Sequence, residues 1–108
     1  MILCTTESVP GRDVSQTLGL VRGSTVRAAH AATDMQAWLK NLVGGEIEEY
    51  TKLLAEAREQ ALDRLMAEAR ARGADAVVGL RFSSCEIADG AAEFLAYGTA
   101  VKFASRAS

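Results

Sequence analysis

The most regular hydrophobic pattern in the chain is an apolar stripe between Glu46 and Arg72. Its members recur at three- and four-residue steps, the period of one helix face: Ile47, Tyr50, Leu54, Ala57, Ala61, Leu65 and Ala69. Acidic residues crowd the start of this segment and arginines its end, as the helix dipole favours. Gly73 is placed to cap it. We therefore predict one long helix over residues 46–72.

The segments before this helix predict shorter elements. Met1–Thr6 is apolar and β-branched and predicts a short strand. Val14–Arg27 predicts either one bent strand or two strands that meet near Gly23, because glycine within a strand usually marks a bulge or a bend. Thr33–Leu42 predicts a short helix, with its apolar residues on one face at helical spacing.

After the long helix, two strands are predicted at Ala76–Ile87 and Ala92–Phe103, joined by the hairpin signal Asp89-Gly90. In the first strand, Val78, Leu80 and Phe82 are expected to share a face. In the second, one face carries Leu95, Tyr97, Thr99, Val101 and Phe103, and the other carries Ala96, Gly98 and Ala100. The small residues predict close packing against the long helix. Because one helix layer covers one face of a sheet, the apolar second face predicts contacts between subunits.

Together these elements predict an α+β fold, in which an antiparallel or mixed sheet lies against one long helix and a short one. The expected order is β-β-α-α-β-β. At 108 residues the chain is expected to form one domain over residues 1–103, followed by a frayed tail over residues 104–108.

Composition narrows the classes of function. Apolar residues make up 49% of the chain and the net charge is −2, which is typical of a globular protein and argues against a nucleic acid or anionic membrane partner. No apolar run approaches the ~20 residues that span a bilayer, and no secretory signal is recognised. Two cysteines are too few for a disulfide framework. We expect a cytoplasmic protein.

An ordered set of short motifs is similar to the YbjQ-like family, which is labelled heavy-metal-binding. The set comprises Thr5-Thr6, Gly11, Leu18-Gly19-Leu20-Val21-Arg22-Gly23, Asp34, Val43-Gly44-Gly45, Tyr50, Leu54, Ala57-Arg58, Ala61, Gly73-Ala74-Asp75-Ala76-Val77-Val78-Gly79 and Gly98-Thr99-Ala100-Val101. The resemblance implies a dodecin-like subunit, with a sheet wrapped around a long helix, in a ring of five copies. It implies no characterised reaction. His30, Thr33 and Glu46 depart from the family pattern, which has asparagine at the first position and often arginine at the other two.

The candidate metal ligands are Cys4, Cys85 and His30. A soft or borderline ion such as zinc or copper takes thiolate and imidazole ligands. The chain has no CxxC or HxxxH spacing, so the favoured alternative is that both cysteines are small buried hydrophobes. Cys85 is the better candidate because its neighbours are polar, and a ring of copies would gather several such thiols. His30 is also explained as a surface or capping residue.

Other candidate ligand positions lie near the start of the long helix. Gly44-Gly45 precedes a helix N-terminus, where free amides hold anions, although a turn between helices is the simpler interpretation. Trp38 and Tyr50 could stack on a ligand ring, or belong to the core or an interface. The helix carboxylates are explained as a solvated face.

Three functions follow. The first is a homo-oligomeric binding or scaffold protein whose partner is itself, with a metal or small-ligand site. The second is an enzyme whose site forms between subunits from residues such as His30, Tyr50 and Glu46. The third is a structural partner of another protein. The first is favoured, because no nucleophile–base pair can be named.

Overall fold

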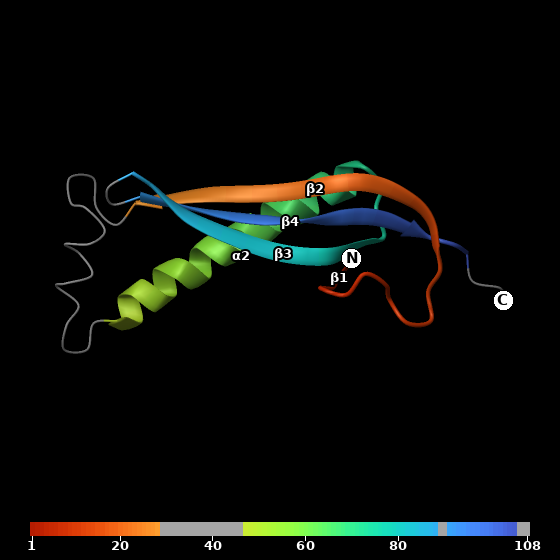
Figure 1. The fold of residues 1–108 in the computed structure, drawn as a ribbon, viewed down its shortest axis with the longest axis horizontal. Helices are drawn as coiled ribbons and strands as arrows, with labels where there is room; N and C mark the ends of the chain where they lie inside the picture. Colours follow the sequence, from red (N-terminus) through yellow and green to blue (C-terminus); the bar gives the residue numbers. More distant parts are fainter. Residues whose placement is uncertain (29–46, 89–90, 106–108) are drawn as a thin grey trace.

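A computed structural model of the chain describes residues 1–28, 47–88 and 91–105. The described elements are β1 (Ile2–Leu3), β2 (Val14–Ala28), α2 (Ile47–Ala71), β3 (Ala76–Ala88) and β4 (Ala91–Phe103) (Figure 1). The short helix predicted at Thr33–Leu42 lies outside these residues, as do residues 106–108 of the predicted tail.

The four strands form one mixed sheet in the order β1-β3-β4-β2. β4 runs antiparallel to β3 and to β2, whereas β1 runs parallel to β3. The three long strands follow the long axis of the molecule, and α2 crosses the sheet obliquely (Figure 1). The predicted α+β fold and the hairpin of β3 and β4 are confirmed.

Helix α2 begins and ends close to the predicted limits. Its C-terminus is capped by Gly73, as the sequence indicates. Gly73 has a φ of 77°, the left-handed conformation that glycine adopts without strain. The Gly73 N–H donates to the Arg70 carbonyl at 2.9 Å, and the Ala74 N–H to the Ala69 carbonyl at 3.1 Å. This pair of bonds is a Schellman motif, which satisfies carbonyls that the helix leaves free.

The main core lies between α2 and the sheet. Small residues on both sides let the helix approach closely. The fully buried members are Val21, Ala61, Leu65, Ala69, Val77, Ala96 and Ala100. The small-residue face of β4 therefore faces the helix, as predicted.

The prediction for the N-terminal strand was too long. Only Ile2 and Leu3 pair regularly, with Ala76 and Val77 of β3. The next residue still follows β3, since the Cys4 N–H donates to the Val77 carbonyl and the Leu80 N–H donates to the Cys4 carbonyl, each at 3.0 Å.

Of the two alternatives for Val14–Arg27, the single strand is confirmed, and the pair of strands meeting near Gly23 is wrong. β2 is one strand of 15 residues, and its register shifts lie nearer its start, between Val14 and Gln16 and between Thr17 and Gly19. Gly19 has a φ of 100°, which suits it to that irregularity. Gly23 is instead required for close packing, because a Cβ there would overlap the Ala61 carbonyl and the Leu65 amide of α2.

The expected shared face of Val78, Leu80 and Phe82 is confirmed for Leu80 and Phe82, whose partner Ala96 lies in the same core, and is wrong for Val78. A register shift between Val78 and Arg81 accompanies a φ of 62° at Gly79, so β3 carries one extra residue there. An extra residue reverses the alternation of side chains. Leu80 therefore joins the helix-side core, while Val78 packs on the opposite face with Ala76, Val101 and Phe103.

Candidate functional site

The described residues leave much of the sheet face opposite α2 uncovered, beyond the end where Cys4 and Val9 pack on it. Directly paired residues of neighbouring strands lie on the same face, and three rows cross this one: Arg22–Tyr97–Arg81, Ser24–Leu95–Ser83 and Val26–Glu93–Cys85. Leu20 and Val26 are more than half exposed, and Tyr97 is 37% exposed. The face therefore combines apolar side chains with a thiol, a carboxylate and arginines.

A hollow of about 520 Å³ lies on this face, at the end of the sheet near β1. Valines and threonines of three strands line it, with a carboxylate and a guanidinium beside them: Val14, Thr17, Val78, Thr99, Val101, Glu7, Gly79 and Arg81. Arg81 is held in place because its Nη1 donates to the carbonyls of Thr5 at 2.8 Å and Leu80 at 2.9 Å. Apolar side chains with convergent polar and charged groups beside them can hold and orient a small ligand.

The candidate ligand Cys85 lies on the same face, in the outer half of β3. It is exposed in a single copy. The alternative interpretation, a small buried hydrophobic residue, therefore does not apply to it there. Its direct partner across the ladder is Glu93 of β4. Paired residues have Cβ atoms roughly 5 Å apart, which lets a thiolate and a carboxylate contact the same ion.

Cys4 is separate from Cys85 within one copy. Cys4 is half-buried and packs beside the cluster of Ala76, Val78, Val101 and Phe103. Its carbonyl bonds to Leu80, and Cys85 lies roughly 16 Å further along the strand at about 3.3 Å per residue. Two sulfurs that share a zinc ion lie within about 5 Å of each other, since each Zn–S bond is about 2.3 Å. One copy therefore does not bring the two thiols together.

One copy does not complete a metal site from its described part. Over residues 1–28, 47–88 and 91–105, no three His, Cys, Asp or Glu side chains are grouped to hold an ion. A structural zinc site needs four ligands. Cys85 and Glu93 supply two donors, so a metal bound there would take its remaining donors from another copy or from solvent.

The other predicted positions lie outside the described residues. These are His30, Trp38, Gly44 and Gly45, together with Thr33 and Glu46. Tyr50 belongs to the first turns of α2 by its backbone, and its side chain is outside the described part.

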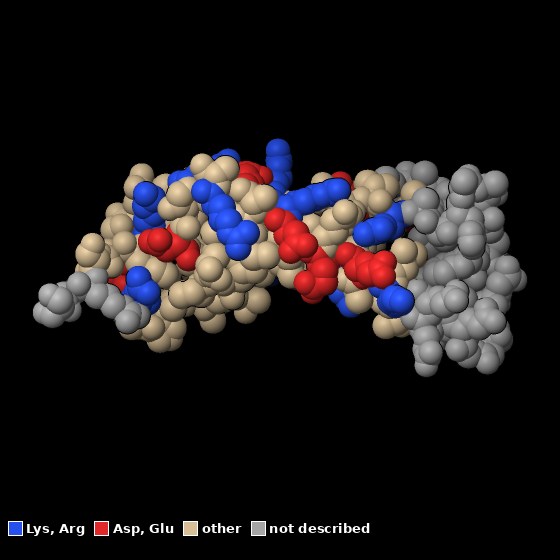
Figure 2. Space-filling view, turned by 180° about the vertical axis from the view of Figure 1, so that it is seen from behind, with Lys and Arg blue, Asp and Glu red and all other residues tan. Residues whose placement is uncertain are grey.

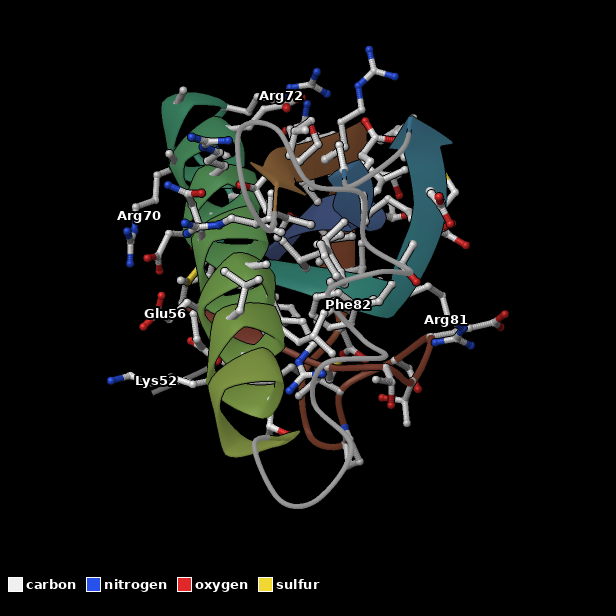
Figure 3. The ribbon with its side chains drawn as sticks, turned by 90° about the vertical axis from the view of Figure 1, so that its left-hand side faces the viewer. Lys52, Glu56, Arg70, Arg72, Arg81 and Phe82 are labelled. Carbon is white, nitrogen blue, oxygen red and sulfur yellow. The ribbon has the colours of Figure 1, made fainter. Side chains whose placement is uncertain are left out.

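Three of the four α2 carboxylates whose side chains the structure describes form a solvated face, as predicted. Glu56, Glu59 and Asp63 are exposed, and Lys52 and Glu56 extend away from the sheet (Figure 3). Lys and Arg side chains are interspersed with Asp and Glu on the face shown in Figure 2. Glu68 departs from this pattern, because its Oε1 pairs with Arg72 at 3.1 Å and its Oε2 accepts the Arg22 N–H at 3.4 Å.

A polar cluster also lies between α2 and β2, on the helix side of the sheet. Thr25 is buried and its hydroxyl donates to Gln60 Oε1, which also accepts a bond from Arg27 Nη2 at 3.3 Å. The Arg27 Nε is buried and finds no partner among the residues that the structure describes. These bonds join the helix to the strand, so we assign the cluster a structural role.

The family of the chain follows from its similarity to known proteins. A family model described as "Putative heavy-metal-binding", YbjQ_1, matches residues 1–104. The chain belongs to the YbjQ-like family. A UPF0145 protein of Archaeoglobus fulgidus is 57% identical over 102 residues and covers 94% of each chain. Another, from Methanosarcina acetivorans, is 49% identical over 106 residues, which is 98% of this chain and 100% of that protein.

Among solved structures, a protein of unknown function from Pediococcus pentosaceus, assigned to the DUF74 family, has a similar fold. Its TM-score is 0.61 at 14% identity, and the match covers 96% of this chain and 98% of that one. At this identity the likeness supports the fold of the YbjQ-like chain alone. No helix in the described part of the chain is both long and apolar enough to cross a membrane.

Proposed function

We propose that this YbjQ-like protein is a homo-oligomeric binding protein, a dodecin-like subunit in a ring of five copies. The uncovered sheet face opposite α2 carries the proposal, because Val14, Leu20, Val26 and Tyr97 are exposed on it. Single apolar residues scattered over a surface are normal, but several large ones exposed on one face of a sheet favour an interaction site, even with polar side chains between them. A second copy is the simplest cover for it.

The shape of the chain supports the same conclusion. It measures 59 × 23 × 16 Å, and its radius of gyration is 17.6 Å. A compact domain of about 100 residues has a radius of gyration of about 13 Å. Strands of 13 to 15 residues are also much longer than the usual five or six. Since α2 is the one helix of the described residues and covers one side of so extended a sheet, contacts with other copies would supply the burial that these residues lack.

We propose further that the ligand site lies where copies meet and that it binds a soft or borderline metal ion, such as zinc or copper. Cys85 and Glu93 are its first donors, because they are direct partners on the uncovered face. The hollow beside Arg81 would accept a small ligand on the same face. A cytoplasmic location agrees with this proposal, because both cysteines are free thiols and that compartment keeps thiols reduced.

Native mass spectrometry of protein purified without added metal tests both parts, followed by titration with zinc and with copper. We expect a five-copy mass and stoichiometric metal uptake. The Cys85→Ser variant should lose at least tenfold in metal affinity, the effect of about 1.4 kcal/mol. Cys4→Ser is the matched control and should bind as the parent does, because Cys4 lies roughly 16 Å from Cys85 along β3.

The outcomes separate the two parts of the proposal. A five-copy mass without metal uptake would support the ring and remove the metal. Equal metal binding by Cys85→Ser and the parent would remove Cys85 from the site. A monomer at all concentrations would contradict the oligomer itself.

A further inference from the structure

The rest of the fold covers the two edges of the sheet to different extents. Along the outer edge of β2, side chains of α2 and of Arg72, the residue that follows it, bond to backbone groups that face away from β4. Arg64 Nη1 donates to the Ser24 carbonyl, Glu68 Oε2 accepts the Arg22 N–H at 3.4 Å, and Arg72 Nη1 donates to the Leu18 carbonyl at 3.2 Å.

These three residues are spaced four apart, so they form one row on the helix surface. The row closes the middle of the β2 edge with charged side chains. Proteins commonly protect an edge strand in this way against pairing with another chain.

The edge formed by β3 is closed over its first half alone. Backbone groups of the N-terminal segment bond to Val77, Gly79 and Leu80, and Arg81 reaches back to the Thr5 carbonyl. Beyond Arg81, no described residue bonds to the outer edge of β3.

The ladder shows which backbone groups are left free there. In an antiparallel pair, alternate residues exchange bonds with the partner and the residues between them point outward. On β2 the Arg22 N–H and the Ser24 carbonyl point outward, so Gly23 bonds to Ala96, its partner on β4. The backbone N–H and carbonyl of Ala96 thus point toward β2, and those of its β3 partner Phe82 point toward the open edge. By the same alternation, the backbone groups of Ser84 and Glu86 also point outward, whereas those of Ser83 and Cys85 bond to β4.

Both faces of this half-strand are exposed as well. Every residue from Arg81 to Glu86 is exposed, and Phe82 is 45% exposed. Arg81 and Phe82 extend from opposite sides of the strand (Figure 3). A half-strand open at its edge and on both faces buries little surface to hold it in an extended conformation.

We infer that the outer edge of β3, from Phe82 to Glu86, pairs with a strand of a second copy. This inference rests on the proposed homo-oligomer and names where its copies join. A second copy is favoured as the occupant because the segment is continuous with the uncovered face, through the row Val26–Glu93–Cys85. The middle of the neighbour's β2 is excluded as the pairing strand, since the arginines and the glutamate of α2 close that edge. The pairing also brings Cys85 to the boundary between copies.

Amide hydrogen exchange of the assembled protein tests this pairing directly. If a second copy adds a strand, the outward amides of Phe82, Ser84 and Glu86 should exchange at least about 100-fold more slowly than in an unstructured peptide, as do bonded amides. They should then match Ser83 and Cys85. If the edge is open in the oligomer, protection should alternate along the strand, and that result would overturn the inference.

A proline substitution provides the second test. Ser84→Pro removes an outward N–H, which an unpaired edge strand tolerates, and Ser84→Ala is the matched control that keeps it. We expect Ser84→Pro to raise the dissociation constant of the oligomer at least tenfold, measured by light scattering after size-exclusion chromatography. Ser84→Ala should assemble as the parent does.

The possible failures are distinct. An intact Ser84→Pro oligomer of parental affinity would refute the pairing and leave the homo-oligomer standing. A parent protein that is monomeric would refute both. If circular dichroism shows that Ser84→Pro does not fold, the exchange pattern of the parent decides.

Discussion

At Gly23 the backbone of α2 lies very close to the sheet. This glycine lies in the middle of β2 and is buried under α2, where a Cβ would overlap the Ala61 carbonyl and the Leu65 amide. Both groups belong to the backbone of a regular helix, so they cannot move away by a change of rotamer as a side chain can. Glycine is required here for space rather than for an unusual φ.

We expect Gly23→Ala to lower the free energy of unfolding by about 3 kcal/mol, because α2 must move away from the buried residues around it. Ser24→Ala is the matched control. Ser24 is exposed on the opposite face and its carbonyl bond to Arg64 survives the change, so an effect within about 0.5 kcal/mol is expected. Urea unfolding at one fixed protein concentration measures both. Equal stability of the two variants would mean that the helix has room to shift.

The glycines also show how much of the structure could be predicted from the sequence at the scale of single residues. Gly73 was correctly predicted as a helix cap, because its position follows directly from where the apolar stripe ends. Gly23 and Gly19 could not be told apart, since an irregular strand and a close helix both require a residue without a side chain. Which of the two applies depends on the position of α2, and that is a tertiary property.

At the scale of elements, the long helix and the hairpin were predictable because their periods extend over many residues. The face of Val78 was not, because one extra residue at Gly79 reverses the alternation after it. As a result, β3 contributes Val77 and Leu80 to the core under the helix, and Val78 to the cluster on the other face. A strict alternation would instead place Val78 and Leu80 on the same face.

The row of Arg64, Glu68 and Arg72 along α2 and its C-terminal end has a consequence for solubility. We expect the triple alanine variant of this row to aggregate faster on warming, because it opens the β2 edge to other chains. Its free energy of unfolding should fall by about 1–2 kcal/mol, since the lost bonds are partly exposed to solvent. Light scattering during a temperature ramp, with urea unfolding, measures the two effects.

The matched control replaces Arg58, Glu59 and Arg70 with alanine. It changes the charge equally, and these residues are exposed and have no strand bonds among the described contacts; Arg70 extends away from the sheet (Figure 3). Aggregation as fast in the control as in the row variant would show that net charge, rather than edge closure, is responsible.

At the scale of the whole molecule, the uncovered face leads to a prediction about assembly. Leu20 is 56% exposed in one copy, so Leu20→Asp should leave the subunit fold intact. In an assembly that covers this face, it would bury a carboxylate in place of an apolar side chain. We expect the dissociation constant to rise more than tenfold, measured by native mass spectrometry across a dilution series.

Ala67→Asp is the control, because Ala67 is exposed on α2 rather than on the sheet. It should assemble like the parent protein. If Leu20→Asp remains assembled as tightly as Ala67→Asp, the face opposite the helix is not the interface.

The candidate site was only partly predictable at this scale. The sequence named Cys85 from its polar neighbours, but it did not name Glu93. A simple two-residue turn at Asp89-Gly90 would pair Glu93 with Glu86. The register shift between Glu86 and Ala88 pairs it with Cys85 instead. A pattern of residue types does not show such a shift, because it arises from the backbone of the hairpin.

The parallel pairing of β1 with β3 has a consequence for the order of folding. Ile2 and Leu3 are synthesised before most of the chain, yet their partners Ala76 and Val77 emerge only after the whole of α2. The hairpin of β3 and β4 joins neighbours in sequence and closes a short loop, whereas β1 must wait through a long one. During translation β1 therefore remains unpaired until β3 has emerged, and it is among the last strands to take its place in the sheet.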